Sequence, residues 1–264
     1  MKKFILAALV LGALGLFFTG CQNEKNTLKV AATSVPHADL LEIIKPELES
    51  RGIHLKIVEV DDYNLPNRLL FEGQVDANFF QHKPFLDEQN QRFNYHLKPL
   101  VAVHIEPLGL YSQIVSSIET LSEGSTIAIP CDPTNEARAL VLLQEVGLIK
   151  LKSCSDNQLA TVYDIEENAK HLKIEEVDAA FLPRALADVD LAVIPANFAL
   201  QAHLEPVKDA LVLESSNSPY ANLIVIRETD EEREDLHKLK EVLTSDKMRK
   251  TILEKYKGSI LPAA

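Results

Sequence analysis

The stretch GQVDANFFQHKPFL, residues 73–86, joins a strand pattern to the start of a helix. Three phenylalanines and one histidine fall within seven of its positions, although the chain is 6% aromatic and has no Trp. Residues 74–80 are predicted as a strand and residues 84–93 as the helix that follows. Because neighbouring strand residues point to opposite faces, Phe79 and Phe80 cannot both face the core. The stretch therefore predicts a strand–helix unit with one ring on a second surface.

The same alternation extends along the chain on both sides of this unit. Strands followed by helices predict an α/β fold with a mainly parallel sheet, covered by helices on both faces. The helix at 132–147 has the clearest ends, because Asp132 can cap it, Pro133 suits its first position and Gly147 can end it. The other expected strands are 28–33, 54–60, 125–130, 173–177, 191–195 and 221–227, and the other expected helices are 35–52, 65–73, 181–188, 228–245 and 246–256.

Two strand-like segments divide these elements into two sets. Residues 101–112 lie between the sets, and residues 221–227 lie near the end of the second. This arrangement predicts two lobes joined by two crossing hinge strands, with the last helices returning to the first lobe. We assign residues 28–108 and 226–264 to lobe 1, and residues 109–225 to lobe 2. Ligands favour such interfaces, so a binding cleft between the lobes is expected.

The N-terminus has the pattern of a lipoprotein leader. Lys2 and Lys3 precede an apolar run that is too short to span a bilayer, and FTGC follows at residues 18–21. We predict a signal peptide at 1–20, a lipidated Cys21 and a polar tether within 21–27. Acyl chains such as palmitate would hold the protein on the cell membrane, facing the periplasm or the extracellular side. An ordinary cleaved signal and an uncleaved anchor remain the alternatives.

Composition, charge and motifs limit the classes of function that the chain can have. With 264 residues and 46% hydrophobic content the chain can bury a large core, and its net charge of −12 argues against nucleic-acid binding. The two remaining cysteines, Cys131 and Cys154, leave open a disulfide or two separate thiols. The sequence contains neither HExxH nor GxSxG, and its histidines lack close ligand spacing. We therefore expect no catalytic residue, no metal and no cofactor.

Six segments resemble the NlpA-type family, the methionine-binding lipoproteins of bacterial ABC importers. The resemblance runs from the lipobox to the C-terminal region. It implies a two-lobed type II periplasmic-binding-protein fold that captures methionine, with the L enantiomer expected, and delivers it without catalysis to an ABC permease and its ATPase subunit. The segments are DDYNLPN (61–67), GQVDANFFQHKPFLD (73–87), VHIEPLGLYS (103–112), TIAIPCDPTNEARALVLLQEVGLIKL (126–151), FLPRALADVDLAVIPANFAL (181–200) and SPYANLIVIR (218–227).

The resemblance also implies a set of ligand-binding residues. Arg138 alone would read as a solvated charge, but it matches the family's carboxylate-binding arginine, and a guanidinium binds a carboxylate bidentately. Tyr63, Phe80 and His82 match the positions that line the side-chain pocket, where aromatic rings suit a thioether. Phe85 is a weaker candidate of the same kind.

Two asparagines complete the implied site. Asn222 in SPYAN matches a ligand-binding asparagine, and Asn197 is expected to replace a second one. Pro195 stands where relatives have that second asparagine. Cys131 stands at a different position, where relatives usually have a further asparagine. Both departures are expected beside the carboxylate site. They leave open a related ligand, either another amino acid or a methionine-containing dipeptide, and a surface-interaction lipoprotein without a transport role. His104 is expected to support the hinge rather than the ligand.

Overall fold

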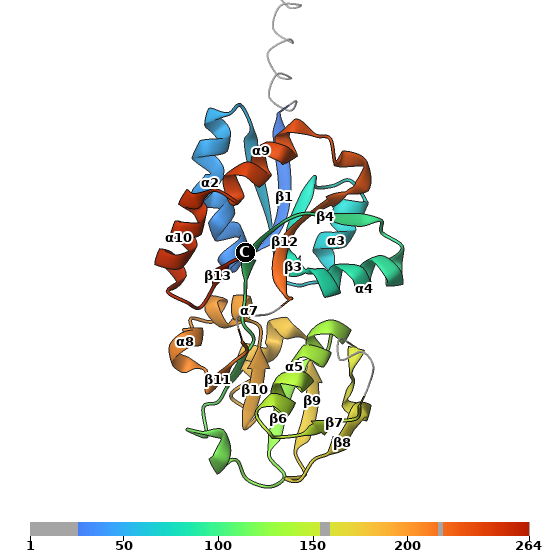
Figure 1. The fold of residues 1–264 in the computed structure, drawn as a ribbon, viewed down its shortest axis with the longest axis vertical. Coiled ribbons are helices and arrows are strands. Elements are labelled where there is room, and N and C mark those ends of the chain that lie inside the picture. Colours follow the sequence, from blue (N-terminus) through green and yellow to red (C-terminus); the bar gives the residue numbers. More distant parts are fainter. Residues whose placement is uncertain (1–25, 154–158, 216–218, 264) are drawn as a thin grey trace, which may run out of the picture.

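The computed structural model describes residues 26–153, 159–215 and 219–263. Two α/β lobes, each built on its own sheet, lie one above the other along the long axis (Figure 1). This architecture confirms the predicted two-lobed α/β fold. The leader, Cys21 and Cys154 lie outside the described residues, so lipidation of Cys21 stays a prediction. Within the described ranges no helix combines the length and apolarity needed to cross a membrane.

Lobe 1 contains a six-stranded sheet in the order β13-β4-β12-β3-β1-β2. Strand β1 pairs in parallel with β2 and β3, whereas β12 runs antiparallel to both of its neighbours, β3 and β4. The expectation of a mainly parallel sheet is therefore wrong, because the chain enters and leaves this lobe through strands of opposite direction. The strands are β1 (Thr27–Thr33), β2 (His54–Val60), β3 (Ala77–His82), β4 (Leu97–Ile105), β12 (Ala221–Arg227) and β13 (Leu261–Pro262).

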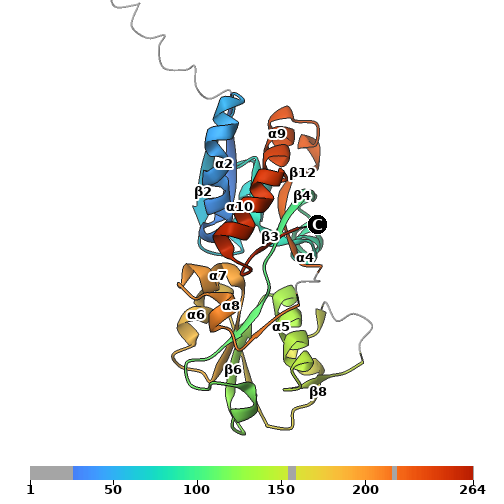
Figure 2. The same ribbon diagram turned by 60° about the vertical axis from the view of Figure 1, so that its left-hand side comes forward.

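Helices cover both faces of this first sheet (Figure 2). On one face, α2 (Asp39–Ser50), α9 (Glu234–Leu243) and α10 (Asp246–Tyr256) bury leucines and Met248 against the strands. On the other face, α3 (Leu65–Phe71) and α4 (Lys83–Phe93) contribute Leu70 and Leu86 to a second, smaller core. The C-terminal helices therefore pack on lobe 1, as predicted.

Lobe 2 contains a five-stranded sheet in the order β11-β5-β10-β6-β9, which is also mixed. Helix α5 (Pro133–Glu145) packs on one face of this sheet, and α6 (Leu182–Ala185) and α7 (Ala196–Gln201) pack on the other. The remaining elements are β5 (Gly109–Tyr111), β6 (Thr126–Pro130), β9 (Lys173–Val177), β10 (Leu191–Ile194), β11 (Val212–Leu213), α8 (Pro206–Asp209), and the separate pair β7 (Lys150–Leu151) and β8 (Ile165–Glu167).

The starts of α5 and α9 show how well local sequence signals predict where a helix begins. Helix α5 begins as predicted, because the Asp132 carboxylate accepts a hydrogen bond from the Asn135 backbone N–H at 3.0 Å. Helix α9 begins later than expected. Glu228–Asp230 form a separate 3₁₀ turn, and Asp230 forms ion pairs with Arg227 and Arg233. The acidic residues of this segment therefore belong to a separate turn that precedes α9.

Two connections link the lobes, and both are attached to neighbouring strands of the first sheet, β4 and β12. The chain passes from β4 to β5 through residues 106–108, and it returns from β11 to β12 through residues 214–220. All of β12 belongs to the first sheet, including residues 221–225, which the sequence analysis placed in lobe 2. The division at 108 and 226 stays a prediction. The strand pairing leads us to propose the two connections themselves as its limits.

Candidate functional site

A small cavity lies between the lobes. Its walls come from the loop after β2, the end of β3, the start of α4, the first interlobe connection, the start of β12 and the N-terminal turns of two lobe 2 helices, α5 and α7. The lining residues are Tyr63, Phe80, Gln81, His82, Phe85, Glu106, Asn135, Arg138, Pro195, Ala196 and Asn222. The cavity therefore combines an aromatic wall with charged and amide groups.

Three rings form the aromatic wall. Phe80 and Phe85 meet edge to face at 5.6 Å, and Tyr63 lies 5.9 Å from each of them. The neighbouring Phe79 points the other way and is fully buried in the lobe 1 core. The expected division of this pair, with Phe79 in the core and Phe80 at the cleft, is confirmed. The wall offers rings at a spacing that suits an apolar or thioether side chain.

His82 ends β3 and caps α4, so both of its ring nitrogens are engaged. Its Nδ1 accepts from the Phe85 backbone N–H at 3.2 Å, and its Nε2 donates to Asn135 Oδ1 across the cleft at 3.0 Å. Burial and the charge of Arg138 lower the pKa of His82 from 6.5 to about 3. His82 is therefore neutral near pH 7 and offers the cavity a ring without charge.

Arg138 is the cation of the site. It is 4% exposed, and its guanidinium lies over the Tyr220 ring at 4.3 Å. Its Nε donates to Glu214 Oε1 at 2.8 Å, and its Nη2 donates to Glu214 Oε2 and to the Glu106 carbonyl. No described residue accepts a hydrogen bond from its Nη1. Glu214 and Glu106 thus fix the guanidinium while one amino group remains available.

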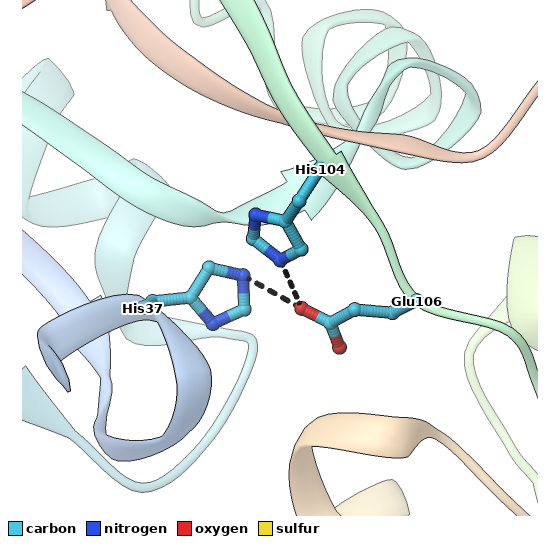
Figure 3. Close-up of side chains that lie close together, drawn as sticks. All are labelled: His37, His104 and Glu106. Atoms are coloured by element: carbon cyan, nitrogen blue, oxygen red, sulfur yellow. Dashed lines mark hydrogen bonds and ion pairs between the residues drawn. The ribbon is translucent and has the colours of Figure 1, made fainter. Parts of the chain in front are cut away.

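Glu106, in the first connection, is a buried carboxylate that no sequence pattern predicted. Its Oε1 accepts from His104 Nε2 at 2.6 Å and lies 3.1 Å from His37 Nε2 (Figure 3). Burial raises the pKa of Glu106, but the two histidines outweigh burial and hold this pKa below its usual range. Glu106 is therefore ionised at neutral pH and places a negative charge at the polar end of the cavity.

The same three side chains also offer a donor set that first-row metal ions accept. Their ligand atoms lie within 4.8 Å of one another, and all three groups are buried. However, the hydrogen bonds to Glu106 place a proton on the Nε2 of each histidine, and a metal would need those lone pairs. These hydrogen bonds account for the contacts among the three side chains, and His104 Nδ1 is buried without a partner among the described residues. His104, with its ring fully buried beside the connection, has the supporting place expected of it.

Asn197 lies behind the wall rather than in it. Its Oδ1 accepts from the Tyr63 hydroxyl at 2.7 Å, and its backbone N–H donates to Glu106 Oε2 at 3.1 Å. Its Nδ2 is buried without a partner among the described residues. Phe198, the next residue, places its ring 5.0 Å from that of Tyr63. Asn197 thus supports Tyr63 and Glu106, and direct contact with a ligand stays a prediction.

Of the residues expected from sequence, the fold brings six to the cavity: Tyr63, Phe80, His82, Phe85, Arg138 and Asn222. Their roles toward a ligand stay predictions. Of the two departures from the family pattern, Pro195 lines the cavity, whereas Cys131 is an exposed free thiol outside it. The expectation that both lie beside the site is therefore wrong for Cys131. Its strand ends at Pro130, and its N–H is directed to Val177 in the neighbouring strand.

Comparison with known proteins agrees with this geometry. The family model described as NlpA lipoprotein matches residues 28–264, which covers both lobes. The chain belongs to the NlpA lipoprotein family. Among NlpA relatives, the chain is 37% identical to the methionine-binding lipoprotein MetQ of Bacillus subtilis, over 100% of both chains. It is 39% identical to the D-methionine-binding lipoprotein MetQ of Escherichia coli K12, covering 97% of this chain and 96% of that one.

Solved structures give the same result for the fold. A nutrient binding protein from Burkholderia cenocepacia bound to methionine superposes with a TM-score of 0.87 at 42% identity, covering 90% of this chain and 100% of that one. A putative methionine-binding lipoprotein from Bacillus subtilis superposes with a TM-score of 0.87 at 38% identity, covering 91% and 99%. The two-lobed architecture is therefore that of the periplasmic substrate-binding proteins in this family.

Proposed function

We propose that this protein is a substrate-binding lipoprotein that captures methionine between its lobes. The observation that carries the proposal is the polarity of the cavity. One part of the lining has three aromatic rings, and the other has the neutral His82, the guanidinium of Arg138 and the carboxylate of Glu106. A zwitterionic amino acid with an uncharged thioether side chain complements both ends.

The polar end fits the two charges of an amino acid separately. The open amino group of Arg138 would donate to the ligand carboxylate, and Glu106 would accept from the ligand ammonium. The aromatic end contains no charged side chain, so a lysine-like or glutamate-like ligand would lose hydration without compensation. These arguments select an amino acid with an apolar or thioether side chain.

Direct contacts between the lobes support a capture role without catalysis. Tyr63 of lobe 1 bonds to Asn197 of lobe 2, and His82 of lobe 1 bonds to Asn135 of lobe 2. Such contacts add to those of an enclosed ligand and stabilise the closed arrangement of the lobes. We propose that the closed protein, held on the cell membrane by lipidated Cys21, delivers its ligand to an ABC permease with a separate ATPase subunit.

Mass spectrometry of the purified protein tests the ligand. Protein prepared without refolding and then denatured should release a compound with the mass of methionine. Calorimetry with both enantiomers on the emptied protein should then give tight binding, with the L form expected to bind more tightly. A different amino acid, a methionine-containing dipeptide, or no binding of either enantiomer would contradict the assignment.

A lipid-phase partition experiment tests the anchor. The full chain expressed in a bacterium should enter the detergent phase of Triton X-114, and Cys21→Ala should move it to the aqueous phase. Equal partition of both proteins would contradict lipidation at Cys21.

A further inference from the structure

His37 is buried beside the cavity but does not line it. It lies in the tight turn Ser34–Ala38 between β1 and α2, and its ring is 0% exposed. Its Nε2 lies 3.1 Å from Asn222 Oδ1. The same Nε2 lies 3.1 Å from Glu106 Oε1 (Figure 3). Both of these partners line the cavity. One histidine therefore contacts two lining residues, and they belong to different segments of the chain.

The hydrogen bonds fix where the proton on this ring lies. Asn222 Oδ1 and the ionised Glu106 carboxylate are both acceptors, so His37 Nε2 must carry hydrogen. His37 Nδ1 lies 2.7 Å from Thr33 Oγ1, and that hydroxyl can either donate or accept. Nε2 is consequently a donor in the neutral ring and in the charged ring alike.

This donor in turn fixes the Asn222 side chain. Its Oδ1 is directed to His37, and a flipped amide would bring two donors together inside the protein, which is costly. No described residue accepts a hydrogen bond from Asn222 Nδ2, and Asn222 lines the cavity. The amide therefore offers the ligand a donor and not an acceptor. An ammonium group could not use this end of the side chain, whereas a carboxylate could.

We propose that His37 is a positioning residue which holds Asn222 with its amino group toward the ligand, and so selects ligands with a free carboxylate. This role rests on the proposed function. Asn222 then acts beside Arg138, whose Nη1 is also available as a donor, while Glu106 provides the acceptor for the ammonium. His37 sets the direction in which the amino acid enters without touching it.

Two substitutions at this position separate positioning from packing. His37→Leu fills the same space against Phe79, whose ring meets that of His37 at 4.6 Å, but it removes the donor. His37→Gln retains an N–H donor and serves as the matched conservative variant. Calorimetry would use methionine and methioninol, which keeps the ammonium and the thioether but lacks the carboxylate.

Under the proposal, His37→Leu weakens methionine binding by about 10- to 100-fold but changes methioninol binding by less than about 3-fold. His37→Gln should restore most of the preference for methionine. An unchanged ratio of the two affinities in His37→Leu would overturn the proposal, because a packing defect weakens both ligands together.

Two further measurements keep the test decisive. In an Asn222→Ala background, His37→Leu should no longer change the ratio, and a full additional loss there would also overturn the proposal. If His37→Leu does not fold, Thr33→Val replaces it, with a shift of about 3-fold expected in the same direction. Failure of the unmodified protein to bind methionine would instead refute the proposed function.

Discussion

Replacing Arg138 by alanine removes the cation of the cavity and one half of a buried ion pair. The guanidinium is 4% exposed, and its partner Glu214 keeps 13% of its side chain exposed. The substitution therefore leaves a largely desolvated carboxylate without its counter-charge. It also removes the hydrogen bond to the Glu106 carbonyl, which lies in the connection between the lobes.

The structure sets the size of both effects. Breaking a buried ion pair from one side costs about 3–5 kcal/mol, and the partial exposure of Glu214 favours the lower end, about 3 kcal/mol in the free energy of unfolding. Losing one partner of a desolvated charge pair with the ligand costs about 2–5 kcal/mol of binding free energy. Methionine affinity should therefore fall by roughly 30- to 5000-fold.

Urea unfolding and calorimetry at pH 7 measure the two effects separately. The double variant Arg138→Ala with Glu214→Gln is the control, because it removes the unpaired charge without restoring the cation. It should regain about 1–2 kcal/mol of the lost stability while binding methionine no better than the single variant. Unchanged methionine affinity in Arg138→Ala would refute the assignment of the carboxylate site.

Three other substitutions test the wall and the hinge. Phe80→Ala should weaken methionine by about 10-fold or more but weaken alanine much less, and equal losses by calorimetry would exclude Phe80 from the side-chain pocket. The pKa of His82 is about 3 in the folded protein and 6.5 as its reference, so the unfolded chain binds more protons between these values and acidification favours unfolding. Between pH 7.5 and 5, His82→Gln should therefore lose on the order of 2 kcal/mol less stability than the unmodified protein in urea titrations, and parallel losses would contradict the neutral state of this ring. Gly109→Ala would place a Cβ 2.5 Å from the buried Tyr111 ring, so thermal unfolding should reveal a loss of about 1–3 kcal/mol, and an unchanged melting temperature would show that the ring moves aside freely.

The sequence was sufficient for most elements because their signals are local. The strand at 54–60 and the last helix at 246–256 appear with the predicted bounds, and α5 has the predicted cap. Strand direction was not accessible in the same way. Whether β12 runs parallel or antiparallel to β3 depends on where the chain returns from lobe 2, and no short-range pattern contains that information.

The candidate site shows the same difference between residues with local sequence signals and residues whose role depends on distant partners. Phe80 and Arg138 were accessible, because strand alternation and a resemblance in the surrounding residues pointed to them. Glu106 and His37 were not, because each gains its role from a partner far away in the sequence: His37 from Asn222, and Glu106 from Asn197. The pairing of Arg138 with Glu214 is hidden for the same reason, since it joins α5 to the second connection.

The position of β12 has a consequence for how the chain is made. It lies between β4 and β3, so the first sheet lacks an internal strand until the C-terminal segment has emerged. Lobe 2 is continuous in sequence and can complete its own sheet earlier, which brings the ends of β4 and β12 together and shortens the loop to be closed. Until then β3 and β4 have unpaired edges that favour aggregation. A chain cut before residue 221 should therefore fail to give a stable lobe 1.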